Sequence, residues 1–110
     1  MNIAILIPAY NTEKFLPSLI DKIFSVFRGK IIIVDDGSRN SISHSHSSVV
    51  VLKNEKNMGK GYSLLKGMQY AFDEGFDAVI TLDSDGQHDP KYISEFLDHH
   101  NRADIVIGTR

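Results

Sequence analysis

Short apolar runs alternate with stretches of helical periodicity along this chain of 110 residues. Continuous apolar runs are typical of strands that are covered on both faces of a sheet. They predict strands at residues 3–7, 31–34, 49–52, 78–82 and 105–107. Apolar residues at helical spacing predict helices between the strands. The first is marked by residues 15–27, the second opens near Gly59-Lys60-Gly61, and the third is marked by Ile93, Phe96 and Leu97.

Proline and glycine indicate where these helices begin and end. Pro17 should lie in the first turn of the first helix, where its missing N–H costs little. Gly75 should end the second helix, because glycine readily adopts the left-handed conformation. Asp89 and Pro90 suit the start of the third helix. Strands and helices in this alternation predict one α/β domain, Rossmann-like, with a mostly parallel sheet and helices on both faces.

Polar motifs directly follow four of the predicted strands, at Pro8–Asn11, Asp35–Ser38, Asp83–Asp85 and Gly108–Arg110. The carboxyl ends of parallel strands lie at one edge of a sheet, which is where ligands bind in open α/β folds. We therefore expect all four motifs to converge on one rim and to form a site there.

Composition and charge narrow the class of protein. Apolar residues make up 42% of the chain and charged residues 24%, which is ordinary for a globular domain. The net charge of -2 gives no reason to expect nucleic-acid binding, and the absence of cysteine excludes disulfides and thiolate metal sites. No apolar run approaches the ~20 residues of a membrane helix, and no signal peptide is evident. A cytoplasmic location is expected, and a peripheral position at the membrane face stays open.

Asp83-Ser84-Asp85 carries the strongest chemical signal in the sequence. Two carboxylates one residue apart, at the exposed end of a strand, suit Mg²⁺ or Mn²⁺, which take oxygen ligands. Gln87 and His88 extend the same polar run. Such a cation neutralises charge that develops on a leaving diphosphate. The alternative is a loop whose acids only cap a helix.

Two other segments suit a nucleotide. Asp35-Asp36-Gly37-Ser38 either forms only a turn or offers a carboxylate to a base N–H or a ribose hydroxyl, with the glycine letting the ligand approach. Lys60 lies where the second predicted helix opens, and it either meets phosphate at the helix N-terminus or is solvated.

The remaining polar and aromatic residues are expected to have structural roles. Segment 38–48 is serine-rich and without periodicity, so we expect a mobile surface loop in which His44 and His46 are solvated. Tyr62, Tyr70 and Phe76 are expected to pack against the sheet.

Four motifs taken together resemble the family 2 inverting glycosyltransferases of the GT-A fold: Ile7–Asn11, Val34–Ser38, Asn57–Gly61 and Leu82–Pro90. Residues 83–90 and 104–110 look most like the polyprenyl-phosphate sugar transferases of the dolichyl-phosphate mannose synthase type. The resemblance extends over almost the whole chain, in the family's order.

The resemblance implies a UDP- or GDP-linked sugar donor and a divalent cation, Mg²⁺ or Mn²⁺. Pro8, Tyr10, Asn11 and Asp36 match positions that hold the base and ribose, and Arg110 matches an arginine that approaches the donor phosphates. Together with the motifs read above, the predicted nucleotide-sugar-binding residues are Pro8, Tyr10, Asn11, Asp35, Asp36, Gly37, Ser38, Lys60, Asp83, Ser84 and Arg110. Asp83 and Asp85 match the family's Asp-x-Asp motif. The implied metal ligands are Asp83, Asp85 and Gln87, and the implied catalytic residue is Asp85.

Three features depart from the family's pattern. Thr12 stands where an acid is common after Tyr-Asn. The segment after Ser38 is shorter than usual and rich in serine and histidine. The chain also ends at Arg110, before the part of the family's domain that carries the acceptor site. We therefore expect residues 1–110 to be a single nucleotide-sugar-binding domain, truncated at its C-terminus.

Three functions stay open at this point. The first is transfer of a sugar from a nucleotide diphosphate to an acceptor such as a polyprenyl phosphate. The second is a nucleotide-sugar-binding module without transferase activity of its own. The third is a nucleotidyltransferase, although that class usually has a glycine-rich, basic loop after its first strand. An uncovered sheet edge further predicts that copies of the chain associate, or that it pairs with a partner chain.

Overall fold

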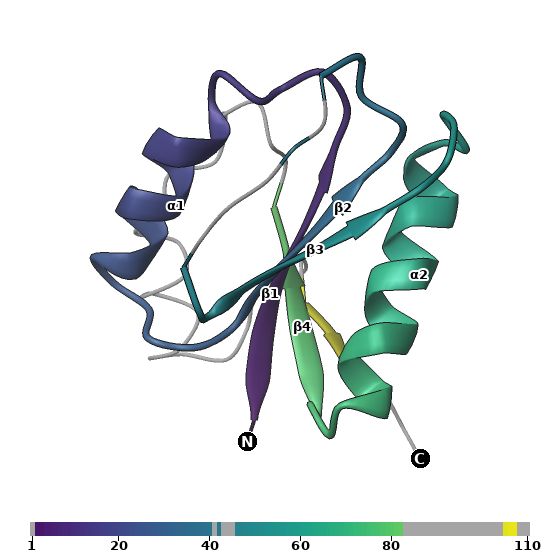
Figure 1. Cartoon of the computed structure of the whole chain (residues 1–110). Helices are drawn as coiled ribbons and strands as arrows, with labels where there is room; N and C mark the ends of the chain where they lie inside the picture. The colour runs from purple at the N-terminus through teal and green to yellow at the C-terminus, as the bar shows by residue number, and fades with distance from the viewer. Residues whose placement is uncertain (1, 41, 43–45, 83–104, 108–110) are drawn as a thin grey trace.

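The computed structural model describes residues 2–40, 42, 46–82 and 105–107, the last of these for the backbone only. Its elements, in chain order and as drawn in Figure 1, are β1 (Ile3–Ala9), α1 (Leu16–Phe24), β2 (Ile31–Asp35), β3 (Val49–Lys53), α2 (Lys60–Asp73), β4 (Ala78–Thr81) and β5 (Ile105–Ile107). Each of these lies where the sequence pattern predicts it, with ends that differ by a few residues. The third predicted helix lies outside the described residues.

The strands form one five-stranded sheet in the order β3-β2-β1-β4-β5. β1 pairs in parallel with both β2 and β4, and β2 pairs in parallel with β3. The predicted α/β architecture with a mostly parallel sheet is therefore confirmed. β1 occupies the centre of the sheet, so that the residues after it have the ends of β2 and β4 on either side.

The last strand runs the opposite way. β5 is antiparallel to β4, and its final residue, Ile107, pairs with Ala78 at the start of β4. The expectation that these strands all end at the same rim is therefore wrong for β5. That strand ends at the edge where β1 and β4 begin, and Arg110 itself lies outside the described residues.

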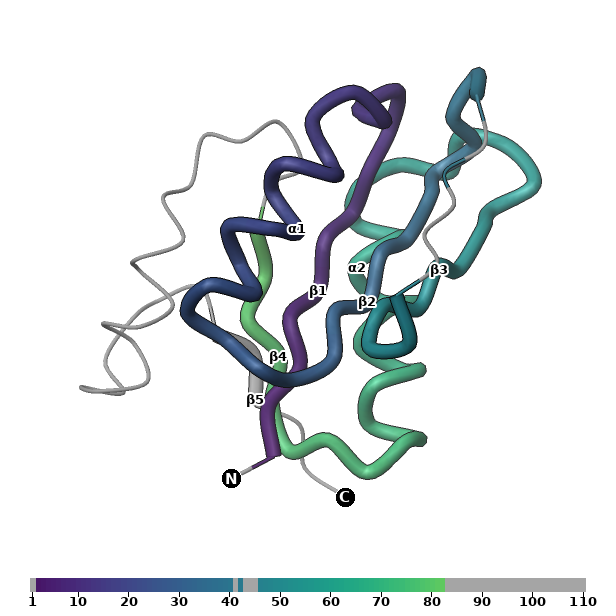
Figure 2. The backbone as a smooth tube through the Cα atoms, turned by 60° about the vertical axis from the view of Figure 1, so that its left-hand side comes forward, coloured from purple at the N-terminus to yellow at the C-terminus, as the bar shows by residue number. Residues whose placement is uncertain are grey.

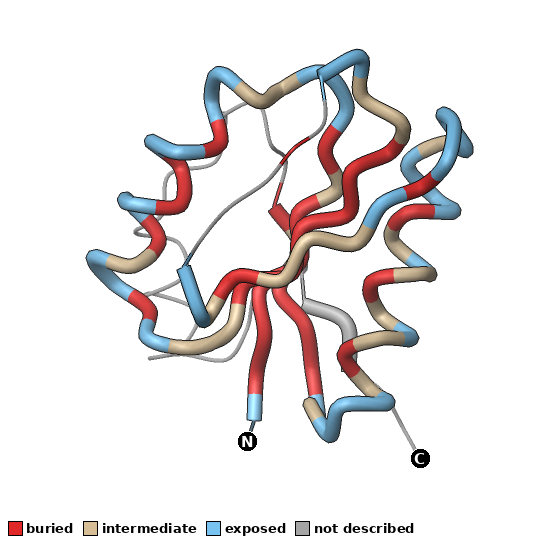
Figure 3. The backbone as a smooth tube through the Cα atoms, viewed as in Figure 1, coloured by how far each residue is buried: buried red, intermediate tan, exposed pale blue. Residues whose placement is uncertain are grey.

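The two helices cover opposite faces of the sheet, as predicted (Figures 1 and 2). Successive strand residues point to alternate faces. In β1, Ile5 and Ile7 face α1, whereas Ala4 and Leu6 face α2. The central strands β1, β2 and β4 are therefore buried on both faces (Figure 3), which explains why they read as unbroken apolar runs.

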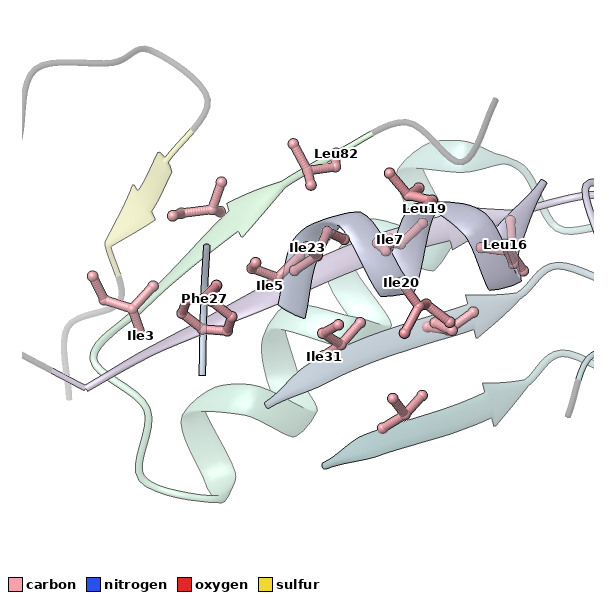
Figure 4. Packing of buried hydrophobic residues seen from close by; sticks show 14 of the residues in the cluster. Ile3, Ile5, Ile7, Leu16, Leu19, Ile20, Ile23, Phe27, Ile31 and Leu82 are labelled. Carbon is pink, nitrogen blue, oxygen red and sulfur yellow. The ribbon is translucent and has the colours of Figure 1, made fainter. Parts of the chain in front are cut away.

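α1 buries one apolar stripe. Leu16, Leu19, Ile20 and Ile23 share that stripe and pack on the sheet (Figure 4). A proline occupies the first turn of the helix, as predicted, where its missing N–H leaves no hydrogen bond unmade. Phe27 follows the helix and is still buried against the same cluster.

α2 packs through small residues. Its fully buried positions are Ser63, Gly67 and Ala71, whereas Leu65 is 69% exposed. Tyr62 is also exposed, so the expectation that it packs is wrong: it lies on the outer side of a helix whose inner side is lined by small residues.

At the end of α2, the predicted packing and the predicted helix stop are both confirmed. Tyr70 and Phe76 are partly buried against the sheet, as expected. Gly75 has φ 93°, a left-handed conformation that ends the helix as the sequence predicts.

We expect Gly67→Val to destabilise the fold by about 1–3 kcal/mol, because a Cβ at this position would overlap the buried side chain of Leu6. Gly61→Val is the matched control, since a Cβ there meets no described atom within 4 Å. Urea unfolding of both variants checks the prediction. Equal stability of the two variants would contradict the close approach of α2 to β1.

Candidate functional site

Hydrogen bonds align the chain segments that follow β1, β2 and β3. The N–H of Asp36 donates to the carbonyl of Ala9 at 2.8 Å, and the N–H of Asn54 donates to the carbonyl of Asp35 at 2.8 Å. On the other side of β1, the N–H of Leu82 donates to the carbonyl of Leu6 at 3.0 Å. The ladder thus continues past the strands, and the described parts of the predicted motifs do meet at one rim.

Asp35 anchors the chain segment that follows it. Its side chain is only 3% exposed. Oδ1 accepts the N–H of Ser38 at 2.9 Å, and Oδ2 accepts the N–H of Ile42 at 3.1 Å. Ile42 is itself buried, so the prediction of a mobile surface loop over residues 38–48 is wrong at this residue. A single carboxylate and one isoleucine side chain tie the segment to the core.

His46, at the other end of this segment, is exposed, and its ring stacks on Phe24 with ring centroids 4.6 Å apart. His44 lies outside the described residues.

Asp36 anchors a different segment, the connection between β3 and α2. Oδ1 accepts the N–H of Met58 at 2.7 Å and the side-chain amide of Asn54 at 2.8 Å. Oδ2 accepts the N–H of Gly59 at 3.0 Å. These bonds fix the turn that immediately precedes Lys60, the first residue of α2. The lysine predicted to meet phosphate therefore begins its helix at the rim, next to a buried carboxylate.

The hydrogen bonds also determine the charge of Asp36. Burial raises the pKa of this carboxyl, but the donors from Met58, Asn54 and Gly59 favour its ionised form. Together they hold its pKa below the ordinary aspartate value of 3.8. Asp36 is therefore a carboxylate at neutral pH, although its side chain is only 4% exposed.

Gly37 is required by the packing of these two segments. Its φ is 72°, and a Cβ on this residue would overlap the backbone of Lys56 and Asn57. The sequence suggested that this glycine lets a ligand approach. The structure shows that the close approach is made by the chain itself, with the turn after β2 lying against the connection before α2.

Asn11 joins the loop after β1 to the loop after β2. It has a left-handed backbone conformation, with φ 55°, which asparagine tolerates better than most residues. Its N–H donates to Oγ of Ser38 at 3.0 Å, and its Oδ1 accepts the N–H of Arg39 at 2.7 Å. Two predicted nucleotide contacts, Asn11 and Ser38, are thus brought together. Tyr10 beside them is half exposed, and Pro8 lies within β1 opposite Val34.

Glu13 provides an acid next to Thr12, the position where the family's pattern has one. Its Oε1 accepts the side-chain amide of Asn40 at 3.2 Å. The backbone at Glu13 and the amide of Asn40 hold the pKa of the Glu13 carboxyl below its ordinary value. Oε2 is shielded from solvent and has no hydrogen-bond partner among the described residues. A ligand hydroxyl could donate the hydrogen bond that this oxygen lacks.

The described carboxylates do not form a cation site. Asp35 and Asp36 direct their oxygens at N–H donors, and no group of three acidic or histidine side chains suited to a metal occurs in the parts of the chain that the structure describes. The predicted metal ligands Asp83, Asp85 and Gln87 lie outside those parts, as do the predicted donor-binding residues Ser84 and Arg110.

Sequence reasoning missed three residues of this rim. Asn54 follows β3 directly, so the rule that singled out Asp35 after β2 could have found it. Ser63, fully buried on α2, receives the side-chain amide of Asn54 at 3.1 Å. Lys66 approaches the other end of the same amide. The repeat of Ser63, Gly67 and Ala71 every four residues is the signal that would have identified the inner side of α2.

We expect Asp36→Asn to destabilise the protein by about 1–3 kcal/mol at pH 7, because an amide cannot accept hydrogen bonds through both of its terminal atoms. The folded pKa of Asp36 is lowered, so its stabilising effect is complete above the unfolded value of 3.8 and is lost as pH falls through the folded pKa. Urea unfolding of wild type and variant at stepped pH measures this difference.

Asp21→Asn, at an exposed position of α1, is the matched control and should change stability little. A difference between wild type and Asp36→Asn that stays constant from neutral to acid pH would contradict the stabilising role of the carboxylate.

The comparisons with known proteins agree with the motifs. Residues 4–110 match the domain described as glycosyl transferase family 2. The chain is 30% identical to a UDP-N-acetylglucosamine–dolichyl-phosphate N-acetylglucosaminyltransferase of Methanococcus voltae, over 98% of this chain and 51% of that protein. It is 28% identical to an undecaprenyl-phosphate mannosyltransferase of Micrococcus luteus, over 100% of this chain and 49% of the relative. The chain thus spans about half the length of these two relatives.

A solved structure shares the fold. Glucosyl-3-phosphoglycerate synthase from Mycobacterium tuberculosis, crystallised with Mn²⁺, UDP and glucosyl-3-phosphoglycerate, aligns with a TM-score of 0.67 at 22% identity. The alignment covers 88% of this chain and 38% of that chain. At this level of identity the likeness shows the fold, and the sequence match over residues 4–110 shows the family. The chain belongs to glycosyl transferase family 2 and has the GT-A fold.

Proposed function

We propose that this chain binds the nucleotide-diphosphate sugar of a glycosyltransferase that passes the sugar to a polyprenyl phosphate. The observation that carries the proposal is the rim at the carboxyl ends of a family 2 sheet, where Asp35 and Asp36 hold two loops in a fixed arrangement. Asn11 joins a third loop to them. The names of the relatives support the substrates, because they specify a UDP-sugar and dolichyl or undecaprenyl phosphate.

The donor nucleotide would lie along this rim. Tyr10 is half exposed beside the loops and offers an aromatic face to a base. In our proposal the polar groups around Asn11, Asp36 and Ser38 line the base and ribose. Lys60 and the start of α2 would meet the diphosphate, since a helix N-terminus favours negative charge. The base stays open between uracil and guanine.

The divalent cation, Mg²⁺ or Mn²⁺, would be held by Asp83, Asp85 and Gln87. Carboxylate and amide oxygens are suitable ligands for either ion. When bound, the cation stabilises the negative charge of the departing diphosphate. In this proposal Asp85 is the catalytic residue of the chain, and Ser84 completes the contacts to the donor.

A polyprenyl-phosphate acceptor suits the carboxylates of this rim. A hydroxyl acceptor needs a general base within hydrogen-bond reach, whereas a phosphate monoester with a second pKa of about 6 is already largely anionic at neutral pH. Asp35 and Asp36 use their oxygens to hold loops and are poorly placed to accept a proton from a substrate.

The position of the protein relative to the membrane belongs to the same proposal. Among the described residues, neither helix has the length and apolarity needed to cross a bilayer. We propose a cytoplasmic domain that meets the lipid acceptor at the membrane face. Association of copies, or pairing with a partner chain, stays a prediction.

A second candidate is a nucleotide-sugar-binding module that does not turn over by itself. Transfer also requires an acceptor to be positioned, and none of the contacts of the described residues has been assigned to one. Binding of the sugar nucleotide without release of free nucleotide, in the presence of polyprenyl phosphate, would identify the module.

We expect calorimetric titration to show that either UDP or GDP binds in the presence of Mn²⁺ and binds more weakly without it. Asp85→Ala should abolish the dependence on Mn²⁺, because it removes a proposed ligand of the cation. Asp73→Ala, at an exposed position near the end of α2, is the control and should bind as wild type does. If neither nucleotide binds to the chain, or if Asp85→Ala binds as wild type does, the proposed donor site is wrong.

Glu13→Gln tests a separate contact. We expect about a tenfold loss of nucleotide affinity. In the wild type, Oε1 accepts from Asn40 and Oε2 would accept from a ribose hydroxyl, whereas glutamine has only one acceptor oxygen for these two donors. Glu55→Gln, on an exposed glutamate of the β3–α2 connection, is the matched control. Equal affinity of the two variants would remove Glu13 from the site.

A further inference from the structure

Lys66 makes two hydrogen bonds that the family's motifs do not account for. Its ammonium group donates to the carbonyl of Lys53 at 2.8 Å and to Oδ1 of Asn54 at 3.0 Å. Lys66 lies on α2, partly buried, and Asn54 is the buried residue that follows β3. The lysine therefore joins the helix to the end of the strand from behind the rim.

The other end of Asn54 points at the rim. Its side-chain Nδ2 donates to Oδ1 of Asp36 at 2.8 Å and to Oγ of Ser63 at 3.1 Å. An ammonium group can only donate, and an ionised carboxylate can only accept. The two charged groups thus dictate which way the amide of Asn54 lies. A flipped amide would turn its NH₂ toward Lys66 and its oxygen toward Asp36, which is unfavourable at both ends.

We propose that Lys66 is a positioning residue for the nucleotide site, acting through the amide of Asn54. By accepting from Lys66, the amide presents its NH₂ to Asp36. Asp36 in turn holds the N–H groups of Met58 and Gly59, and so the start of α2. The consequence for nucleotide affinity rests on the proposed function. The orientation of Asn54 rests on the hydrogen bonds alone.

Lys66→Met separates the charge from the packing. Methionine keeps a long apolar side chain and removes the donors, which leaves Oδ1 of a buried amide without its charged partner. Lys66→Arg keeps the positive charge and the donors. Lys22→Met, on an exposed lysine of α1, controls for the loss of one positive charge.

The first experiment reads the amide directly, without nucleotide. In NMR spectra of the full chain, the Nδ2 protons of Asn54 should exchange slowly with water in wild type, in Lys66→Arg and in Lys22→Met. In Lys66→Met they should shift and exchange at least about tenfold faster, because only Asp36 of the two charged groups then orients the amide. Unchanged Asn54 signals in Lys66→Met would overturn the inference.

The second experiment reads nucleotide affinity, with UDP or GDP in Mn²⁺ as the probe. We expect Lys66→Met to bind about tenfold more weakly, a loss typical of removing a group that orients a ligand-binding residue, and Lys66→Arg to stay within about twofold of wild type. In an Asn54→Ala background, Lys66→Met should cause no further loss, because its effect passes through Asn54. If Lys66→Met weakens nucleotide binding as much in the Asn54→Ala background as in wild type, Lys66 does not act through Asn54 and the mechanism is wrong.

Thermal unfolding of each variant shows whether a loss of affinity is only a loss of folded protein. If wild type binds neither nucleotide, the proposed function fails, and the Asn54 spectra still decide whether Lys66 orients the amide. If the spectra change as expected but affinity does not, the amide is oriented without consequence for the site, and the assignment of Lys66 to nucleotide binding is wrong.

Discussion

Two adjacent carboxylates are buried at the end of β2, and the arrangement of the rim depends on them. Burial of charge is costly unless hydrogen bonds replace the lost water. Here the replacements are backbone N–H groups from two different loops. Asp35 binds those of Ser38 and Ile42, and Asp36 binds those of Met58 and Gly59. The cost of burying the charges is thereby offset by contacts that fix both loops.

This constraint links the fold to the proposed chemistry. A site that binds a diphosphate gains from loops that are already in place, because ordering them on binding would cost affinity. Asn11 adds the loop after β1 to the same assembly through Ser38 and Arg39. Gly37 lets the segments lie backbone against backbone. The rim is therefore held by hydrogen bonds of the chain with itself, and its exposed groups are left for a ligand.

The sequence predicted the sheet better than it predicted the site. Unbroken apolar runs identified the strands because both faces are buried, and Pro17 and Gly75 located helix ends by local geometry. The direction of β5 could not be predicted, because an apolar run does not encode its pairing partner. The anchoring of Ile42 was missed for a related reason. A single apolar residue in a serine-rich segment produces no hydrophobic periodicity, and the role of Ile42 is evident only from its hydrogen bond to Asp35.

Amide hydrogen exchange of the unliganded protein is the most direct test of the central claim that the buried carboxylates hold the rim. Met58 and Gly59 lie outside helix and strand, yet their N–H groups donate to Asp36. The account predicts protection comparable to that of strand amides, and loss of that protection in Asp36→Asn while the amides of β1 stay protected. Exchange of both amides at the rate of the exposed loop residue Lys56 in wild type would contradict it.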